Sequence, residues 1–426
     1  MQQRTLDDWL AWMESHHPRQ IELGLERVAG VAANLTLDLS GSAIVTVGGT
    51  NGKGSCVAFL DAMLRAQGYR VGCYTSPHLM RYNERVAIDG AAVDDAQMCA
   101  AFSAVEQALN GISLTYFEFG TLAALWLLQR ARLDVIVLEV GLGGRLDAVN
   151  IIDPNVAVLT TIDLDHQDYL GSDRESIGRE KAGIFRADTP AICLDAEPPR
   201  TVVDYARQIG ARWYPRGDAF VFNAHEQSWD WSGAGLPHNA AYRELPLPAL
   251  PLPSAAAALA ALQCLPLAIS EDAIRRGLKS ATLQGRFQQL QRRGVDIILD
   301  VAHNPQAAHW LAQRLQRLPK RKTHAVLAIM ADKDVEAVIA ALQAQIDGWF
   351  VGDLIGNPRA LPAAQLSALL TARAGVAALV ANSIEHAFST ALERAQAGER
   401  VVVFGSFFTV AAVLAQLQTE GNIDGR

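Results

Sequence analysis

The sequence predicts an α/β fold: a mostly parallel sheet domain followed by a smaller Rossmann-like α/β domain. Short apolar strands alternate with helical patterns through most of the chain, which is typical of a parallel sheet covered on both faces. A second alternation begins near Gly285, after a proline-rich stretch. Because 426 residues exceed the usual size of one domain, we expect two domains, residues 1–283 and 284–426.

Composition narrows the class of protein. The net charge is −8 and no Lys/Arg-rich run occurs, so a nucleic-acid partner is not expected. The five cysteines are scattered without a CxxC pair, which argues against a disulfide framework or a cysteine zinc site. The polar N-terminus does not resemble a signal peptide, and no apolar run approaches the ~20 residues of a membrane helix. We expect a cytoplasmic protein without a membrane partner, and a monomer.

The first domain is predicted from uninterrupted apolar runs and from helical periodicity. Asp134–Val140 is the clearest buried strand. The expected strands are Ala43–Val47, Val71–Thr75, Val135–Val140, Val156–Thr161 and Ala191–Leu194. The expected helices are Ser55–Gln67, Ala96–Leu109 and Phe119–Arg130.

The pattern is less regular between Pro198 and Pro253. Trp229-Asp230-Trp231 lies in what reads as a polar, turn-rich region. The alternate prolines of Leu245–Pro253 rule out a central strand, because they remove ladder donors. We expect an extended segment there, leading into a helix over Ser254–Cys264.

The second domain shows the same alternation over its whole length. The expected strands are Val295–Val301, Ala325–Met330, Gly348–Val351 and Val401–Gly405.

The segment Gly49–Ser55, G-T-N-G-K-G-S, has the arrangement of a phosphate loop. It follows a buried strand and opens a helix, so its glycines and the helix N-terminus can turn N–H groups toward phosphate oxygens. Lys53 can reach the terminal phosphates and Ser55 can bind Mg²⁺. The loop departs from the strict Walker A pattern at Val47 and Gly54. The alternative is an ordinary glycine-rich turn with a solvated lysine.

Polar residues follow two further strands of the predicted sheet. Glu139 ends one strand and His166 lies just past another, and sites form beyond the carboxyl ends of strands in open α/β sheets. Glu139 is a candidate Mg²⁺ ligand, or the partner of Arg145 in an ion pair. His166 is a candidate metal ligand or general base, or a structural loop residue.

Two other stretches allow both a functional and a structural interpretation. Thr115-Tyr116-Phe117-Glu118 places aromatics beside a carboxylate, which suits either a platform for a flat heterocycle or the edge of the core. Lys181, in G-R-E-K-A-G-I-F, is by itself most simply a solvated charge, although burial can lower the pKa of a lysine.

In the second domain, Asp300-Val301-Ala302-His303-Asn304-Pro305 follows an apolar strand. Together with Arg286 at the domain junction, Asp300 and His303 could hold a nucleotide from the far side of an interdomain cleft. Taken alone, this motif is weak evidence.

Considered together, these motifs resemble the folylpolyglutamate synthase family over essentially the whole chain. The matching stretches include I-E-L-G-L-E-R-V at residues 21–28, T-S-P-H-L at 75–79 and L-E-V-G-L-G-G-R-L-D-A-V-N at 138–150. The phosphate loop, T-Y-F-E, L-D-H, G-R-E-K-A-G-I-F, G-R-F and D-V-A-H-N-P complete the ordered set. The loop alone would leave the related muramyl-peptide ligases open.

The resemblance implies roles for individual residues. Those of the nucleotide site are Asn51, Gly52, Lys53, Gly54, Ser55, Ser254, Arg286, Asp300 and His303. Those of two Mg²⁺ sites are Ser76, Glu139, His166 and Lys181, the last as a carbamate. Those near the pterin-bearing substrate are Thr115, Tyr116, Phe117, Glu118 and Leu146. Ser254 stands where the family usually has Asn. Lys53, His166 and Lys181 are the expected catalytic residues.

The implied activity is ATP-dependent addition of L-glutamate to dihydropteroate and to reduced folates, through an acyl phosphate. ATP and Mg²⁺ are the expected cofactors. The alternatives are a muramyl-type ligase for another acid, or an ATPase switch that makes no product.

Overall fold

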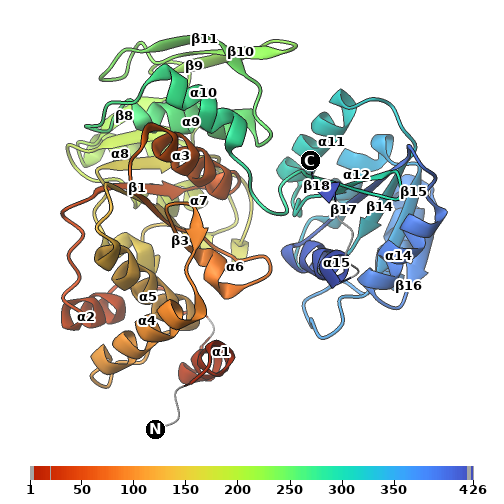
Figure 1. Cartoon of the computed structure of the whole chain (residues 1–426), viewed down its shortest axis with the longest axis horizontal. Coiled ribbons are helices and arrows are strands. Elements are labelled where there is room, and N and C mark those ends of the chain that lie inside the picture. Colours follow the sequence, from red (N-terminus) through yellow and green to blue (C-terminus); the bar gives the residue numbers. More distant parts are fainter. Residues whose placement is uncertain (1–3, 20, 420–423, 426) are drawn as a thin grey trace. The chain divides into compact units, whose positions relative to one another are not determined.

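The computed structural model describes residues 4–19, 21–419 and 424–425. The chain forms two compact units, Met1–Thr282 and Leu283–Arg426 (Figure 1). None of the helices described is long and apolar enough to cross a membrane.

The first unit is built on an eight-stranded sheet in the order β4-β3-β2-β5-β1-β6-β7-β8. Every pairing from β2 to β8 is parallel, and only β3 and β4 at one edge run antiparallel, so the predicted mostly parallel sheet is confirmed. The strands are β1 Ala43–Gly48, β2 Val71–Tyr74, β3 Val86–Ile88, β4 Ala91–Ala92, β5 Val135–Glu139, β6 Val156–Leu159, β7 Pro190–Cys193 and β8 Arg212–Pro215.

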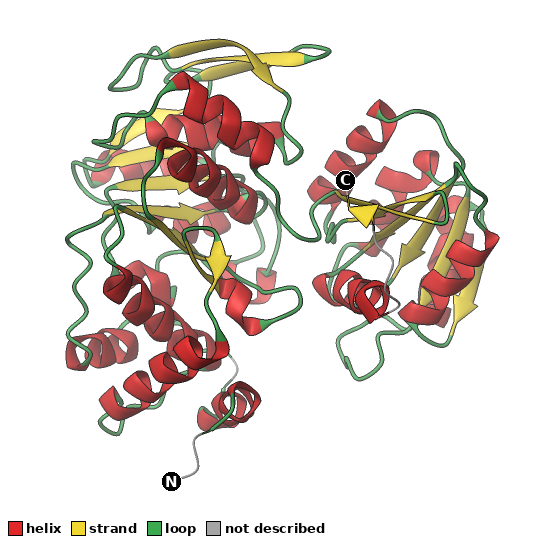
Figure 2. Cartoon of the chain, in the orientation of Figure 1, coloured by secondary structure: helices red, strands yellow, loops and turns green. Residues whose placement is uncertain are grey.

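Helices cover both faces of this sheet (Figures 1 and 2). Ile136 and Leu138 of β5 face a core shared with α1, α2, α4 and α5, whereas α3, α9 and α10 pack together on the opposite face. The helices of this unit are α1 Leu6–His16, α2 Glu26–Asn34, α3 Lys53–Gln67, α4 Asp95–Ala108, α5 Tyr116–Ala131, α6 Gln167–Leu170, α7 Arg174–Ala182, α8 Arg200–Gln208, α9 Leu252–Leu262 and α10 Glu271–Ser280. Two 3₁₀ turns are η1 Tyr82–Arg85 and η2 Ala148–Ile151.

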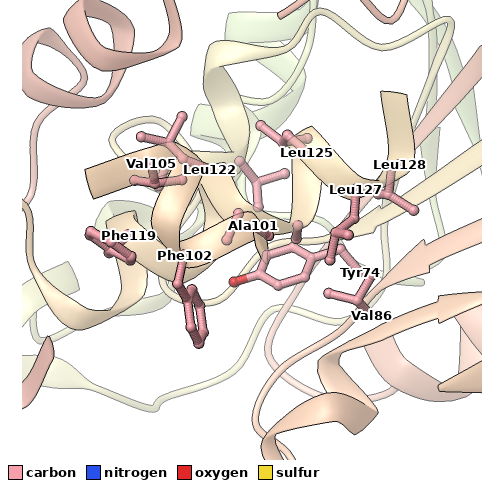
Figure 3. Packing of buried hydrophobic residues seen from close by; sticks show 14 of the residues in the cluster. Tyr74, Val86, Ala101, Phe102, Val105, Phe119, Leu122, Leu125, Leu127 and Leu128 are labelled. Atoms are coloured by element: carbon pink, nitrogen blue, oxygen red, sulfur yellow. The ribbon is translucent and has the colours of Figure 1, made fainter. Parts of the chain in front are cut away.

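The α4–α5 core holds the N-terminus of α5 in place. Figure 3 shows Phe102 of α4 and Phe119 of α5 packed with Tyr74 of β2 among leucines and valines. The Tyr74 hydroxyl finds a partner inside this core, the Thr121 hydroxyl at 3.1 Å. A buried Phe is worth several kcal/mol of stability (about 3–5 on truncation to Ala), so this packing fixes α5 firmly.

The region that we expected to be polar and turn-rich contains a small antiparallel sheet, so that interpretation is wrong. Its strands are β9 Val221–Ala224, β10 Ser228–Ser232 and β11 Ala241–Pro246. The period of two places Trp229 and Trp231 on one buried face and Asp230 on the other. Both indoles donate hydrogen bonds, to the carbonyls of Pro246 (3.0 Å) and Ala256 (3.2 Å).

The prolines of the proline-rich segment lie where a missing backbone N–H is tolerated. β11 is an edge strand, where Pro246 removes no ladder bond that the sheet needs. The following helix α9 starts at Leu252, slightly before the predicted position, with Pro253 in its first turn.

The second unit contains a seven-stranded mixed sheet in the order β16-β15-β14-β17-β13-β12-β18. Its strands are β12 Gln288–Arg292, β13 Val295–Leu299, β14 Thr323–Leu327, β15 Gly348–Gly352, β16 Ala378–Ala381, β17 Arg400–Phe404 and β18 Asp424–Gly425. Its helices are α11 Pro305–Arg317, α12 Val335–Leu342, α13 Ala363–Ala374, α14 Ile384–Arg394 and α15 Phe407–Thr419, with the 3₁₀ turn η3 Gln343–Gln345. The four predicted strands are present. β12, β16 and β18 were missed, because Gln-Gln-Leu-Gln-Arg lacks an apolar run, β16 is a short edge strand and β18 has only two residues.

Candidate active site

Strand order gathers the predicted residues of the first unit at one edge of its sheet. β2, β5, β1 and β6 are consecutive neighbours and parallel, so their carboxyl ends meet. These ends lead to Ser76, Glu139, the phosphate loop and the Thr160–His166 segment. The Ser76 amide donates a hydrogen bond to Glu139 Oε2 at 3.2 Å.

At Gly49, the phosphate loop packs on the end of β6 without room for a side chain. A Cβ on Gly49, whose φ is +139°, would lie 1.9 Å from the Thr160 hydroxyl oxygen. The Asn51 amide donates to the Thr161 hydroxyl at 3.1 Å. Gly52, with φ +85°, caps α3 and supplies no side-chain acceptor to its N-terminus. An uncapped helix N-terminus beside Lys53 suits phosphate oxygens, so the loop fits a nucleotide.

Lys53 and Lys181 converge on one carbonyl of this loop. Lys53 Nζ donates to the Gly49 carbonyl at 3.0 Å, and Lys181 Nζ donates to the same oxygen at 3.1 Å. Lys181 is buried in α7, contrary to its simplest interpretation as a solvated charge. Burial and, to a lesser extent, the neighbouring charge of Lys53 together lower the pKa of Lys181 to about 7. A substantial neutral fraction of Lys181 therefore exists near neutral pH.

The candidate metal ligands differ in their exposure. Glu139 is buried at the strand end, and Arg145 pairs with Glu180 at 2.9 Å, so the alternative Glu139–Arg145 pair is absent. His166 caps the short helix α6 in a left-handed conformation, with its side chain 46% exposed. Within the described residues, no group of three or more His, Cys, Asp or Glu is arranged to hold a metal by itself. A metal here would need the serine, Lys181 as a carbamate, or phosphate oxygens as further ligands.

The T-Y-F-E stretch forms the capped N-terminus of α5. Thr115 caps the helix, and Glu118 Oε2 accepts the Thr115 amide at 2.7 Å. Glu118 Oε1 accepts Arg27 Nη2 at 2.8 Å. Both carboxylate oxygens thus hold the protein itself, which favours a supporting role for Glu118 over direct contact with a ligand.

The aromatic residues of this stretch remain partly exposed, as does Leu146. The end of the Phe117 ring lies so close to Gly141 that a Cβ there would be 2.5 Å from its Cζ. This contact joins the α5 N-terminus to the loop after β5. Tyr116, Phe117 and Leu146 are therefore the side chains available to an aromatic ligand.

Asp147 is a buried residue to which the sequence analysis assigned no role. Burial raises its pKa to about 6, although it accepts amides of Leu142 (2.8 Å) and Val149 (3.0 Å). Its position after the Gly-rich loop that follows β5 is the sequence feature that could have identified Asp147 as a candidate site residue. Ser254 of α9 also reaches the phosphate loop, because its hydroxyl donates to the Gly52 carbonyl at 3.3 Å.

Within the second unit, Arg286, Asp300 and His303 gather at the end of β13. Asp300 accepts the amides of Phe287 (2.8 Å) and Ala302 (2.9 Å). Burial raises the pKa of Asp300, and the nearby Arg286 charge opposes that rise. His303 Nδ1 donates to the Val301 carbonyl at 2.8 Å. The Arg286 guanidinium lies over the Phe407 ring, 5.1 Å from its centre.

Comparison with known families first defines the class of protein. The Mur ligase middle domain matches residues 47–198, and the Mur ligase glutamate ligase domain matches residues 285–407. The chain therefore has the two catalytic domains of a Mur-type ligase, and it is an ATP-dependent enzyme.

Individual relatives then narrow the class. The chain is 46% identical to the Escherichia coli dihydrofolate synthase/folylpolyglutamate synthase over 96% of this chain and 94% of the relative. A solved structure, E. coli FolC in complex with DHPP and ADP, has a TM-score of 0.93 at 45% identity, covering 98% of this chain and 99% of that one. A bifunctional folylpolyglutamate synthase/dihydrofolate synthase with Mn, AMPPNP and L-glutamate bound has a TM-score of 0.90 at 45% identity, covering 97% and 98%. This chain belongs to the dihydrofolate synthase/folylpolyglutamate synthase family, and ATP with a divalent metal is its cofactor set.

Proposed function

We propose that the protein joins L-glutamate to dihydropteroate and adds further glutamates to reduced folates. The observation that carries this proposal is the convergence of Lys53 and Lys181 on the Gly49 carbonyl, beside the strand ends that bear Ser76 and Glu139. Relatives bind ADP with DHPP, and a nucleotide analogue with Mn and L-glutamate, which supports the same substrates here.

The proposed residue roles follow from their positions. Asn51–Ser55 and Ser254 would hold the nucleotide from the first unit; Arg286, Asp300 and His303 would contribute from the second. Residues 1–283 would act as the ATPase domain and 284–426 as its Mur ligase-type partner. We also expect a cytoplasmic monomer without nucleic-acid or membrane partners.

The chemistry requires two steps. A carboxylate oxygen of the acceptor attacks the γ-phosphorus of ATP, ADP leaves, and an acyl phosphate forms. The amine of glutamate then attacks the acyl carbon, the C–O bond to phosphate breaks, and the amine loses a proton. Lys53 and the α3 N-terminus would stabilise charge on the transferring phosphoryl group. Bound Mg²⁺, held by Ser76, Glu139, His166 and modified Lys181, would supply further charge neutralisation.

Carbamylation of Lys181 is part of the proposal. The neutral amine adds to carbon dioxide and loses a proton, which converts a cation into an oxygen donor. The lowered pKa of Lys181 favours this step, because a larger fraction of the amine is neutral near pH 7. The product would relieve the crowding of two cations at the Gly49 carbonyl.

Phosphate release from MgATP tests the activity. The purified protein is assayed with glutamate plus either dihydropteroate or tetrahydrofolate. Release that requires glutamate with both acceptors is the expected result. Release with tetrahydrofolate alone would reduce the function to a folylpolyglutamate synthase. Release without any acceptor would support an ATPase switch, and release only with another acid would support a different Mur-type ligase.

A further inference from the structure

Arg85 is a buried cation for which the structure supplies no anion. The residue ends η1 and is only 8% exposed. Its side chain donates from Nε to His78 Nδ1 at 2.9 Å and also hydrogen-bonds with Tyr74, but no ion pair joins it to an Asp or Glu among the described residues. Burying an uncompensated charge is costly, so such a group is normally paired or awaits a ligand.

The neighbouring acid is committed elsewhere. Glu84 precedes Arg85, but its oxygens accept the amides of Leu79 (2.7 Å), Met80 (2.9 Å) and Arg81 (2.7 Å). Arg27 provides a contrast within the same unit, because it bridges the carboxylates of Glu22 and Glu118 at 2.6 and 2.8 Å. Arg85 thus lacks the carboxylate partners that the half-buried Arg27 of the same unit has.

Aromatic rings hold the Arg85 guanidinium in place. Its central carbon lies 5.0 Å from the centre of the Tyr82 ring and 5.7 Å from that of Tyr116. Rings of this kind orient a guanidinium through cation–π attraction without neutralising it. Both known side-chain partners, His78 and Tyr74, are uncharged, and the terminal nitrogens have further N–H groups that suit a carboxylate.

The position of Arg85 connects two segments of the candidate site. Its carbonyl accepts the Thr75 amide at 2.8 Å, directly before Ser76. Its ring neighbour Tyr116 belongs to the α5 N-terminus, where Phe117 and Leu146 lie open to an aromatic ligand. A pterin acceptor on that surface would carry its carboxylate end toward the strand ends.

We propose that Arg85 forms a carboxylate-binding subsite for the acceptor, distinct from the phosphate loop. This inference rests on the proposed function and names the part of the acceptor that the first unit recognises. Two sources share the chemistry: the carboxylate that reacts, which dihydropteroate also carries, and the α-carboxylate of a glutamylated folate, which does not react.

Equilibrium binding to the full chain tests the subsite without requiring turnover. Tetrahydrofolate, its α-amide and dihydropteroate are titrated into the wild type, Arg85→Gln, Arg85→Lys and the control Arg81→Gln. Arg81 is an exposed arginine paired with Asp95. Loss of a charge-assisted bond should weaken acceptor binding to Arg85→Gln by about 10-fold or more. Arg85→Lys should recover part of it, and Arg81→Gln should match the wild type.

The measurements distinguish the two carboxylates that Arg85 could bind. They also distinguish a failure of the subsite proposal from a failure of the proposed function. The subsite holds the α-carboxylate if replacing tetrahydrofolate by its α-amide lowers the affinity of the wild type as much as replacing Arg85 by Gln lowers the affinity for tetrahydrofolate. If dihydropteroate binding weakens equally in Arg85→Gln, it holds the reacting carboxylate. Unchanged binding of both acceptors by a folded Arg85→Gln, judged by circular dichroism, would overturn the subsite. Absence of ligase turnover in the wild type would overturn the proposed function instead.

Discussion

The carboxyl edge of the first sheet and the turn after β13 in the second unit carry similar residue types in different settings. At the first edge, groups from four strands, α7 and α9 meet at one loop, and two cations share the Gly49 carbonyl. After β13, Asp300 accepts the backbone amides of Phe287 and Ala302, and His303 donates to the Val301 carbonyl. The first edge is assembled from segments far apart in the sequence and places two lysines on one carbonyl, whereas in the second unit backbone amides hold a buried carboxylate. We therefore expect chemistry to fail most when the first edge is changed.

Lys53→Ala should break that edge most severely. Because Lys53 is the cation beside the α3 N-terminus, turnover should fall by about 100- to 1000-fold with the fold intact. Steady-state phosphate release measures the loss, with Lys279→Ala, on the surface-facing end of α10, as the control. Turnover like that of the wild type would remove Lys53 from the phosphate site.

Lys181→Ala should have the next largest effect. Loss of the proposed carbamate ligand to Mg²⁺ should reduce activity by about 10- to 100-fold. If the carbamate supplies oxygen ligands, a small carboxylate such as formate should restore part of the activity. Activity is measured with and without formate and at varied Mg²⁺. An unchanged Mg²⁺ dependence in this variant would contradict the metal-side role.

Asp300→Asn tests the turn after β13 and should act mainly on stability. The Asn side chain has one acceptor oxygen, whereas Asp300 accepts two backbone N–H groups. Its NH₂ group would therefore face one of these N–H groups, and the free energy of unfolding should fall by about 1–3 kcal/mol. Urea unfolding measures it, with the exposed Asp272→Asn as control. A loss confined to turnover, with no loss of stability, would show that the two settings differ less than we argue.

His78→Gln should give the smallest change, seen only in pH dependence. Burial lowers the pKa of His78 to about 4 from 6.5, and the Arg85 charge adds to that shift. The unfolded chain therefore binds more protons between pH 4 and 6.5, so the stability of the folded protein rises with pH across that window. Gln can still accept from Arg85 but does not titrate, so the melting temperature of the variant should rise less steeply. An equal slope in both proteins would assign the pH dependence to other groups.

Local patterns explain how much of the molecule could be predicted. The parallel sheet and the phosphate loop follow from apolar strands and one glycine-rich turn, which are properties of neighbouring residues. The β9–β11 sheet was missed because Trp229 and Trp231 are buried by partners that lie far along the chain, such as Ala256. Lys181 and Arg85 were not derivable as buried cations for the same reason: their surroundings are assembled by the fold. The resemblance to a family supplied the role of Lys181, and the structure supplied its burial.

Oxygen transfer from the acceptor tests the central claim most directly. Dihydropteroate with an ¹⁸O-labelled carboxylate is incubated with the enzyme, MgATP and glutamate, and the released phosphate is analysed by mass spectrometry. If the carboxylate attacks the γ-phosphorus at the Lys53 edge, each phosphate will carry one ¹⁸O atom from the acceptor. Phosphate without ¹⁸O, released alongside product, would contradict an acyl-phosphate route through this site.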